Sequence, residues 1–180
     1  MTDFMDIIRN RRSVRVYQEK EISATTVHGI LEAVQWSPSW ANSQCWEIVV
    51  VRNPEMKREL SKVLSPKNPA TKSVENAPVV LVLCGRLNVS GFYKGEVTTK
   101  FGDWFMFDLG IACQSICLAA HDRGLGSVVV GLFDHNAAAK LLKTPEGIEV
   151  VAMIPLGYPA RVPSPPARKA IETFTHSETF

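Results

Sequence analysis

A cluster of cations near the start of the chain is the first group of residues that could do chemistry. Arg11, Arg12 and Arg15 fall within five residues, together with the hydroxyl of Ser13. Guanidinium groups donate in a rigid planar fork, which suits a phosphate or another delocalised anion. On an extended backbone Arg11, Ser13 and Arg15 would point to one side and Arg12 to the other. The cluster is therefore predicted either to bind an anion or to form a solvated basic turn.

A second polar stretch, residues 37–44, is rich in short hydrogen-bonding side chains and precedes a predicted strand. Its sequence is Ser-Pro-Ser-Trp-Ala-Asn-Ser-Gln. Asn42 and Gln44 carry both donors and acceptors, which suits recognition of a heterocycle edge with carbonyl groups and ring nitrogens. A turn that caps its own backbone at the end of a helix would use much the same residues, and both interpretations remain open.

Other chemical motifs are weak or absent from the sequence. Cys113, Cys117 and His121 would share one helical face, but a closed zinc site needs a fourth ligand, so apolar packing of reduced thiols and no metal are predicted. Gly124-Leu125-Gly126 follows a helix, whereas a dinucleotide fingerprint must open one. No GxSxG, HExxH or P-loop pattern occurs. The remaining parts fit a bound cofactor that carries its own reactivity.

Composition limits the class of protein. The 180 residues are 46% hydrophobic and 21% charged, which indicates one globular domain over residues 1–180. Lys and Arg number 20 against 18 Asp and Glu, so the net charge of +2 gives no bias toward nucleic acid or membrane. The N-terminus has neither a signal nor a transit pattern, and we expect a cytoplasmic protein.

Hydrophobic periodicity predicts the elements that must position these residues. Ser23 is a credible N-cap for a helix that ends before Pro38. Further helices are predicted near residues 54–64, 102–123 and 137–143, strands at 46–51, 79–84, 127–130 and 150–155, and loops at 65–71 and 85–100. The continuous apolar strand 79–84 should be central and covered on both faces.

The helix predicted over 102–123 is apolar almost all round, so it should lie between layers or between subunits. Polar residues leave its apolar part too short for a membrane span. Its small residues would allow a second helix to approach closely and favour a dimer: Gly110, Ala112 and Ala119. The proline-rich tail from about 157 to 180 is predicted to be extended and to lie against its own chain or another.

The order and spacing of several motifs resemble the FMN-dependent nitroreductase family nearly from end to end. The motifs are Arg11 to Arg15, Ser37 to Trp46, Asp108 to Gln114, Gly124 to Ser127 and Ile154 to Pro159. The resemblance implies an α+β fold, a three-layer α-β-α sandwich with a mostly antiparallel central sheet. It also implies an intertwined homodimer that holds FMN at the subunit interface.

The resemblance also implies roles for individual residues. Arg11, Arg12 and Ser13 would hold the phosphate and ribityl end of FMN, and Arg15 would face the pyrimidine ring. A loop that reaches the partner's FMN would comprise Pro38, Ser39, Trp40, Asn42 and Gln44. Val130 and Gly131 would present backbone N–H groups to the N5 and O4 edge, and Arg168, with Lys169, would close over the phosphate. Cys45, where the family usually has proline, and the bulky Trp40 depart from the pattern.

The activity that the resemblance implies is hydride transfer from NADH or NADPH, through FMN, to an electron-poor small molecule such as a nitroaromatic or a quinone. The donor would leave before the acceptor binds, in a ping-pong sequence. Two alternatives remain open: another flavin-dependent dehydrogenase or flavin-processing enzyme on the same scaffold, and a protein that binds FMN without turnover.

Overall fold

A four-stranded antiparallel sheet organises the fold. The computed structural model describes residues 3–180. The strand order is β1 (Trp46–Val51), β2 (Val79–Arg86), β6 (Ile148–Gly157) and β5 (Gly126–Ser127). All three neighbouring pairs are antiparallel. Every residue of β2 except Arg86 is buried, which confirms the central strand predicted from its continuous apolar run.

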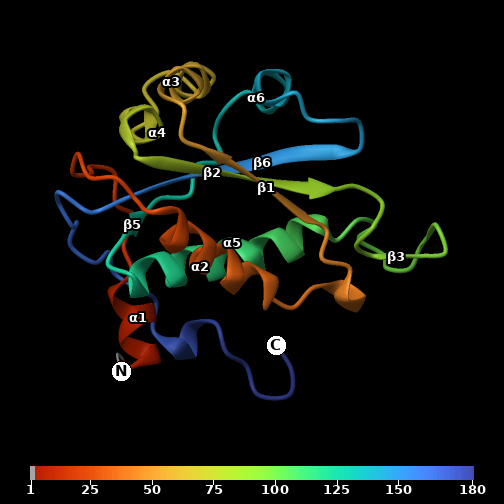
Figure 1. The fold of residues 1–180 in the computed structure, drawn as a ribbon. Helices are drawn as coiled ribbons and strands as arrows, with labels where there is room; N and C mark the ends of the chain where they lie inside the picture. The colour runs from red at the N-terminus through yellow and green to blue at the C-terminus, as the bar shows by residue number, and fades with distance from the viewer. Residues whose placement is uncertain (1–2) are drawn as a thin grey trace.

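Helices cover both faces of the sheet (Figure 1). Helices α2 (Ala24–Gln35) and α5 (Phe105–Asp122) lie on one face, and α3 (Pro54–Lys62), α4 (Thr71–Asn76) and α6 (His135–Leu142) on the other. Side chains alternate along β2, so that Leu81 and Leu83 enter one buried cluster while Val80 and Val82 enter a second. The α+β, three-layer sandwich with an antiparallel sheet is therefore confirmed.

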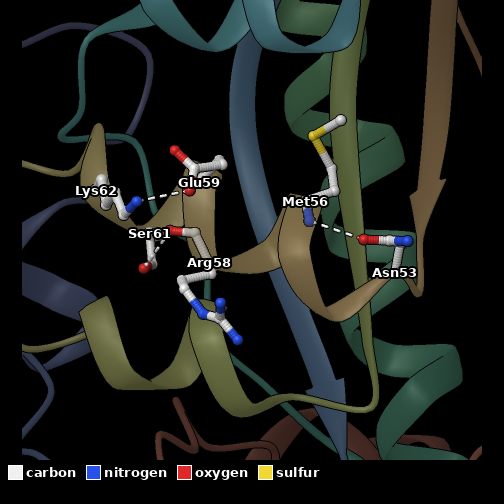
Figure 2. Close-up of polar contacts among 6 residues, drawn as sticks. All are labelled: Asn53, Met56, Arg58, Glu59, Ser61 and Lys62. Atoms are coloured by element: carbon white, nitrogen blue, oxygen red, sulfur yellow. Dashed lines mark hydrogen bonds and ion pairs between the residues drawn. The ribbon is translucent and has the colours of Figure 1, made fainter.

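Local capping explains where two helices begin. Ser23 Oγ accepts a hydrogen bond of 3.0 Å from the Thr26 backbone, as predicted for α2. In α3, Asn53 Oδ1 accepts from Met56 N at 2.9 Å, and the buried Ser61 hydroxyl donates to Arg58 O at 2.8 Å (Figure 2). These bonds satisfy groups that a helix terminus or a buried side chain would otherwise leave without a partner.

Several predicted boundaries were wrong. The predicted loop 65–71 ends one residue earlier, where helix α4 begins. Helix α4 was not predicted, because its six residues are too few to show a hydrophobic period. The segment predicted as the loop 85–100 continues β2 to Arg86 and then forms a small hairpin of β3 (Phe92–Tyr93) and β4 (Glu96–Val97). The predicted strand 127–130 is regular only in β5, followed by a single bridge between Val130 and Met153.

Two predictions for α5 and the C-terminal tail hold only in part: that three small residues of α5 would face a second helix, and that the tail would be extended. Ala112 and Ala119 are buried in the chain's own core, so only Gly110 of the three small residues is exposed on α5. Residues 160–180 are exposed throughout, with one short 3-10 turn, η2 (Ile171–Thr173). Within residues 3–180, none of the helices is long and apolar enough to cross a membrane.

Candidate functional site

The segment that carries the arginines runs along the β5 edge of the sheet. It follows α1 (Phe4–Asn10), and Ser13 forms a parallel bridge with Ser127. Val14 N donates to Ser127 O at 2.9 Å, and Ser73 Oγ donates to Arg15 O at 2.9 Å. These backbone contacts fix the positions from which the arginine side chains project.

The close approach of this segment depends on a glycine. A Cβ atom added to Gly126 would lie 2.6 Å from Val14 Cβ, well inside van der Waals contact. Tyr17 anchors the far end of the segment, since its hydroxyl donates toward Val14 O at 2.8 Å and Pro155 O at 3.0 Å. Burial raises the pKa of Tyr17, so the phenol keeps its proton and remains a donor.

The guanidinium groups of Arg11, Arg12 and Arg15 form no ion pair with a carboxylate of residues 3–180. Arg12 donates to the Arg9 and Arg11 carbonyls at 2.6 and 2.9 Å, at the C-terminal end of α1. Arg15 is exposed and donates to Ser13 O at 3.4 Å. The cationic charge of this segment therefore remains available to a ligand.

A cavity of about 240 Å³ lies beside the cluster. Its lining includes Arg11, Arg12, His121 and the Gly124 to Ser127 backbone. Both arginines line it, contrary to the predicted alternation, because Arg11 is the C-cap of α1 and the extended stretch begins only after it. Burial, and then the charges of Arg11 and Arg12, lower the pKa of His121. We name this region, Arg11 to Arg15 with Gly124 to Ser127, the arginine end.

The polar loop predicted at residues 37–44 is a tight turn that contains the 3-10 helix η1 (Trp40–Asn42). Ser39 Oγ accepts from Gln44 N at 2.9 Å, and Gln44 Nε2 donates to Asn42 Oδ1 at 3.1 Å. Asn42 and Gln44 have φ values of 56° and 48°, in the left-handed region. The loop thus satisfies part of its own backbone, as the alternative interpretation predicted, while Pro38, Asn42 and Gln44 remain exposed.

A buried carboxylate that the sequence did not single out holds this loop. Asp108 is completely buried in the first turn of α5. Its Oδ1 accepts from Trp40 N at 3.0 Å, and its Oδ2 accepts from the Ser43 and Ser90 hydroxyls at 3.2 and 2.7 Å. The sequence shows Asp108 as an acidic residue inside an apolar helix and as the first residue of the family motif Asp108 to Gln114, but neither pattern indicated that it supports the loop.

Cys45 completes the set of donors to Asp108. Its Sγ lies 3.5 Å from Asp108 Oδ2. Burial, and then the nearby Asp108, raise the pKa of Cys45 to about 12, so the thiol keeps its proton and can donate. We name this region, residues 38–45 with Asp108, the amide end.

The two regions lie at opposite ends of α5 (Figure 1). Asp108 is in the first turn of α5, and His121, beside the arginines, is in the last. At about 1.5 Å of rise per residue these two side chains are attached roughly 20 Å apart along the helix. One chain therefore does not bring the arginine end and the amide end to a common small-molecule site.

The remaining predicted site residues fall into two places. Val130 is buried and exchanges two backbone hydrogen bonds of 2.9 Å with Met153, while Gly131 is exposed and lines a cavity of about 580 Å³ with Phe105 and Met106. Arg168 and Lys169 are exposed on the tail, and neither lines the cavity at the arginine end. Among the described residues, no group of three potential ligands could hold a metal ion.

Comparison with known proteins gives one consistent family. The Nitroreductase family model matches residues 8–74 and 65–158. A protein of Methanothermobacter thermautotrophicus named "Putative NADH dehydrogenase/NAD(P)H nitroreductase" is 33% identical over 165 residues, 89% of this chain and 80% of its own length. A Bacillus subtilis protein named FMN reductase [NAD(P)H] is 26% identical over 191 residues, 100% of this chain and 75% of its own length.

A solved structure agrees with these relatives. A nitroreductase family protein from Clostridium novyi has a TM-score of 0.78 and 27% identity, and the match covers 88% of this chain and 86% of that one. The matched residues 8–158 contain the arginine end, the amide end and all four strands of the sheet. The chain therefore belongs to the nitroreductase family.

Proposed function

We propose that this protein is an FMN-dependent oxidoreductase that takes hydride from NADH or NADPH and reduces an electron-poor small molecule such as a nitroaromatic or a quinone. Membership of the nitroreductase family and the name of the Bacillus subtilis FMN reductase support the cofactor and the electron donor. The observation that carries the proposal is the arginine end. There Arg11 and Arg12 line a small cavity, Arg15 lies exposed in the same segment, and none of the three guanidinium groups has a carboxylate partner among residues 3–180.

The donor set at the arginine end fits the phosphate end of FMN. Arg11 and Arg12 border the cavity, and the Ser13 hydroxyl lies in the same segment. Guanidinium and hydroxyl donors suit a phosphate group, which carries negative charge and several acceptor oxygens. At about 240 Å³ the cavity is smaller than the 300–1,000 Å³ typical of whole-ligand sites. A single chain would therefore enclose the phosphate end and leave the ring to other surfaces.

The separation of the two ends of α5 supports a homodimer. If α5 of one copy packs against α5 of a second copy in antiparallel fashion, the arginine end of one lies near the amide end of the other. The α5 surface is suited to this, since Gly110 is exposed and Phe107 is 61% exposed. Pro38, Ser39, Trp40, Asn42 and Gln44 would then contact an FMN molecule held by the partner's arginines.

The tail and the β1 edge of the sheet give a second argument for a dimer. Within residues 3–180, β1 pairs only with β2 and its other edge has no strand partner. A groove of about 810 Å³ runs beside that edge, lined by Val49 to Asn53 and by parts of α3 and α6. Exposed strand edges in stable proteins are usually covered. The exposed residues 160–180 of a second copy would cover this edge, and would place Arg168 and Lys169 at the dimer interface.

Within this arrangement, FMN supplies the redox chemistry, and the protein supplies binding, orientation and charge. Arg15 would set a fixed positive charge beside the pyrimidine edge of the ring, where reduction adds negative charge. The Gly131 backbone, which has open space around it, would meet the opposite edge. The nicotinamide donor would leave before the acceptor stacks in the same space, which gives ping-pong kinetics.

An anaerobic titration tests the proposal. Purified protein is loaded with FMN, and NADH or NADPH is added while the visible flavin absorption is followed; a nitroaromatic or a quinone is then added. We expect bleaching by at least one nicotinamide and recovery on addition of the acceptor, in a protein that elutes as a dimer. A bound flavin that neither nicotinamide bleaches would identify a flavin-binding protein without turnover. A protein with no affinity for FMN would refute the proposal.

A further inference from the structure

The loop of the amide end contains backbone conformations that are unfavourable for non-glycine residues. Three residues within four positions have positive φ: Ala41 at 46°, Asn42 at 56° and Gln44 at 48°. Non-glycine residues adopt this region at a cost, and such a conformation persists only where surrounding contacts impose it. The internal bonds of the loop, from Ser39 to Gln44 and from Gln44 to Asn42, do not fix its position on α5.

Asp108 supplies the external restraint. It bonds the loop at Trp40 N, in the first residue of η1, at the Ser43 hydroxyl just after η1, and at Cys45 where the loop ends. An ionised carboxylate has about four lone-pair sites, and these three residues and Ser90 provide four donors. The group is therefore well solvated by the protein although it is completely buried and has no ion pair with a cation of residues 3–180.

The fourth donor comes from a different segment. Ser90 is completely buried at the base of the β3–β4 hairpin, and its Oγ lies 2.7 Å from Asp108 Oδ2. The same residue accepts from Trp104 N through its backbone carbonyl at 3.0 Å, so it also ties the hairpin to the start of α5. Packing there is tight, because a Cβ atom added to Gly91 would lie 2.5 Å from Gly102 O.

We infer that Asp108 is a positioning residue that locks the loop 38–45 and the hairpin segment 88–104 into one unit. The loop and the hairpin segment are linked because both donate hydrogen bonds to the Asp108 carboxylate. Loss of Asp108, or of a donor on either segment, should therefore loosen both. The consequence for ligand binding rests on the proposed function: a change at Ser90, which has no role in holding FMN, should weaken FMN binding because it releases the loop.

The first test uses amide hydrogen exchange on the cofactor-free protein. Asp108→Asn replaces one acceptor oxygen by an NH₂ group that faces donors, and should accelerate exchange in both 38–45 and 88–104 by about tenfold, the equivalent of one charge-assisted hydrogen bond. Ser43→Ala and Ser90→Ala keep the carboxylate and remove one donor each, so they decide the question if the Asp108 variant does not fold. Each should accelerate exchange in both segments.

Ser61→Ala is the matched control. Ser61 is also a buried serine whose hydroxyl bonds one neighbour, but it lies in α3 on the other face of the sheet. Its replacement should change exchange in α3 alone. If Ser90→Ala accelerates exchange only around residue 90, and Ser43→Ala only in the loop, the inferred coupling is wrong.

The second test measures FMN affinity by quenching of flavin fluorescence. We expect Asp108→Asn and Ser90→Ala to raise the dissociation constant about tenfold and about threefold, and Ser61→Ala to leave it unchanged. Equal affinities for Ser90→Ala and Ser61→Ala would overturn the inferred effect on binding. If the unmodified protein does not bind FMN while exchange in the two segments remains coupled, the proposed function fails and the positioning role of Asp108 stands.

Discussion

The arginine end and the amide end, at the two ends of α5, are positioned by different kinds of contact. At the arginine end the main chain does the positioning: an extended segment lies on β5 because Gly126 has no side chain, and the guanidinium groups are left without carboxylate partners among residues 3–180. At the amide end a buried carboxylate does the positioning, and its bonds to side chains and to one backbone N–H hold a turn with unfavourable φ values.

The pKa shifts reflect the same difference. Burial is the largest cause of both shifts; beyond it, the charges of Arg11 and Arg12 lower the pKa of His121, whereas Asp108 raises the pKa of Cys45. The arginines at one end therefore have no carboxylate partner among residues 3–180, whereas the Asp108 carboxylate at the other end already accepts four hydrogen bonds from the protein. A binding site that uses both the free arginines and the ordered loop would need the arginine end of one chain and the amide end of another. The proposed dimer would bring these two ends together.

The strongest way to break the arginine end alone is Gly126→Ala. The added methyl group would meet Val14, so we expect a loss of about 1–3 kcal/mol in the free energy of unfolding and at least about tenfold weaker FMN binding. Urea unfolding and fluorescence titration measure the two effects. Because the nearest atom is Val14 Cβ, which alanine would keep, the double variant that should recover part of the lost affinity is Val14→Gly with Gly126→Ala. Wild-type stability in Gly126→Ala would contradict the close approach described here.

Replacement of single arginines separates ligand binding from folding. Arg11→Ala should weaken FMN binding by about 10- to 100-fold with little loss of stability, because its guanidinium makes no ion pair with a carboxylate of the described residues. Arg12→Ala should also lower the free energy of unfolding by about 0.5–1 kcal/mol, since Arg12 bonds the last carbonyls of α1. Fluorescence titration of FMN at several salt concentrations measures this, and added salt should weaken FMN binding by the wild type more than by either variant. An Arg11→Ala protein with unchanged FMN affinity would show that the phosphate binds elsewhere.

Gly110→Leu asks whether the two ends meet across a dimer. No atom lies within 4 Å of a Cβ added at Gly110, so the substitution should not destabilise the single chain, and the better helix propensity of leucine should raise its stability by up to about 1 kcal/mol. If α5 packs against a second copy, the larger side chain should weaken dimerisation by about tenfold. Sedimentation at several concentrations measures this, with Lys140→Leu on the exposed surface of α6 as the control. A dimer of unchanged affinity would exclude close packing at Gly110.

The smallest expected effect concerns pH. The lowered pKa of His121 means that the unfolded chain binds this proton more readily than the folded one. Its contribution to stability is therefore present above the ordinary histidine pKa of about 6.5 and is lost as the pH falls below it. His121→Gln should show a smaller loss of urea resistance between pH 7.5 and pH 5.5 than the wild type. His28→Gln, on the exposed side of α2, should keep the wild-type dependence; equal behaviour of all three proteins would refute the assignment.

The sequence predicted the features that depend on local pattern. The start of α2 followed from the Ser23 cap, and the burial of β2 on both faces followed from an uninterrupted apolar run. Helix α4 could not be found in this way, because its stability comes from packing of two or three side chains and not from a period. The bridge at Val130 likewise depends on a partner, Met153, that only the folded chain brings near.

The candidate site was predictable in its residue types and less so in its supports. Three closely spaced arginines left an anion site and a solvated basic turn both open, and the family resemblance favoured the anion site and added the roles of single residues. Asp108 was not identified as a support, because its four donors come from positions 40, 43, 45 and 90, which no local pattern connects. The placement of the predicted site residues at both ends of α5 likewise depends on the tertiary structure.

The antiparallel pairing of β2 with β6 has a consequence for the order in which the protein matures. Val79 pairs with Leu156, and the arginine segment is held partly by Ser73 and otherwise by contacts with Ser127, Pro155 and Pro159. Chain synthesis must therefore reach the last quarter of the sequence before the residues at its beginning acquire their positions. During translation the segment Arg11 to Arg15 therefore cannot dock on the sheet until β5 and β6 have been made.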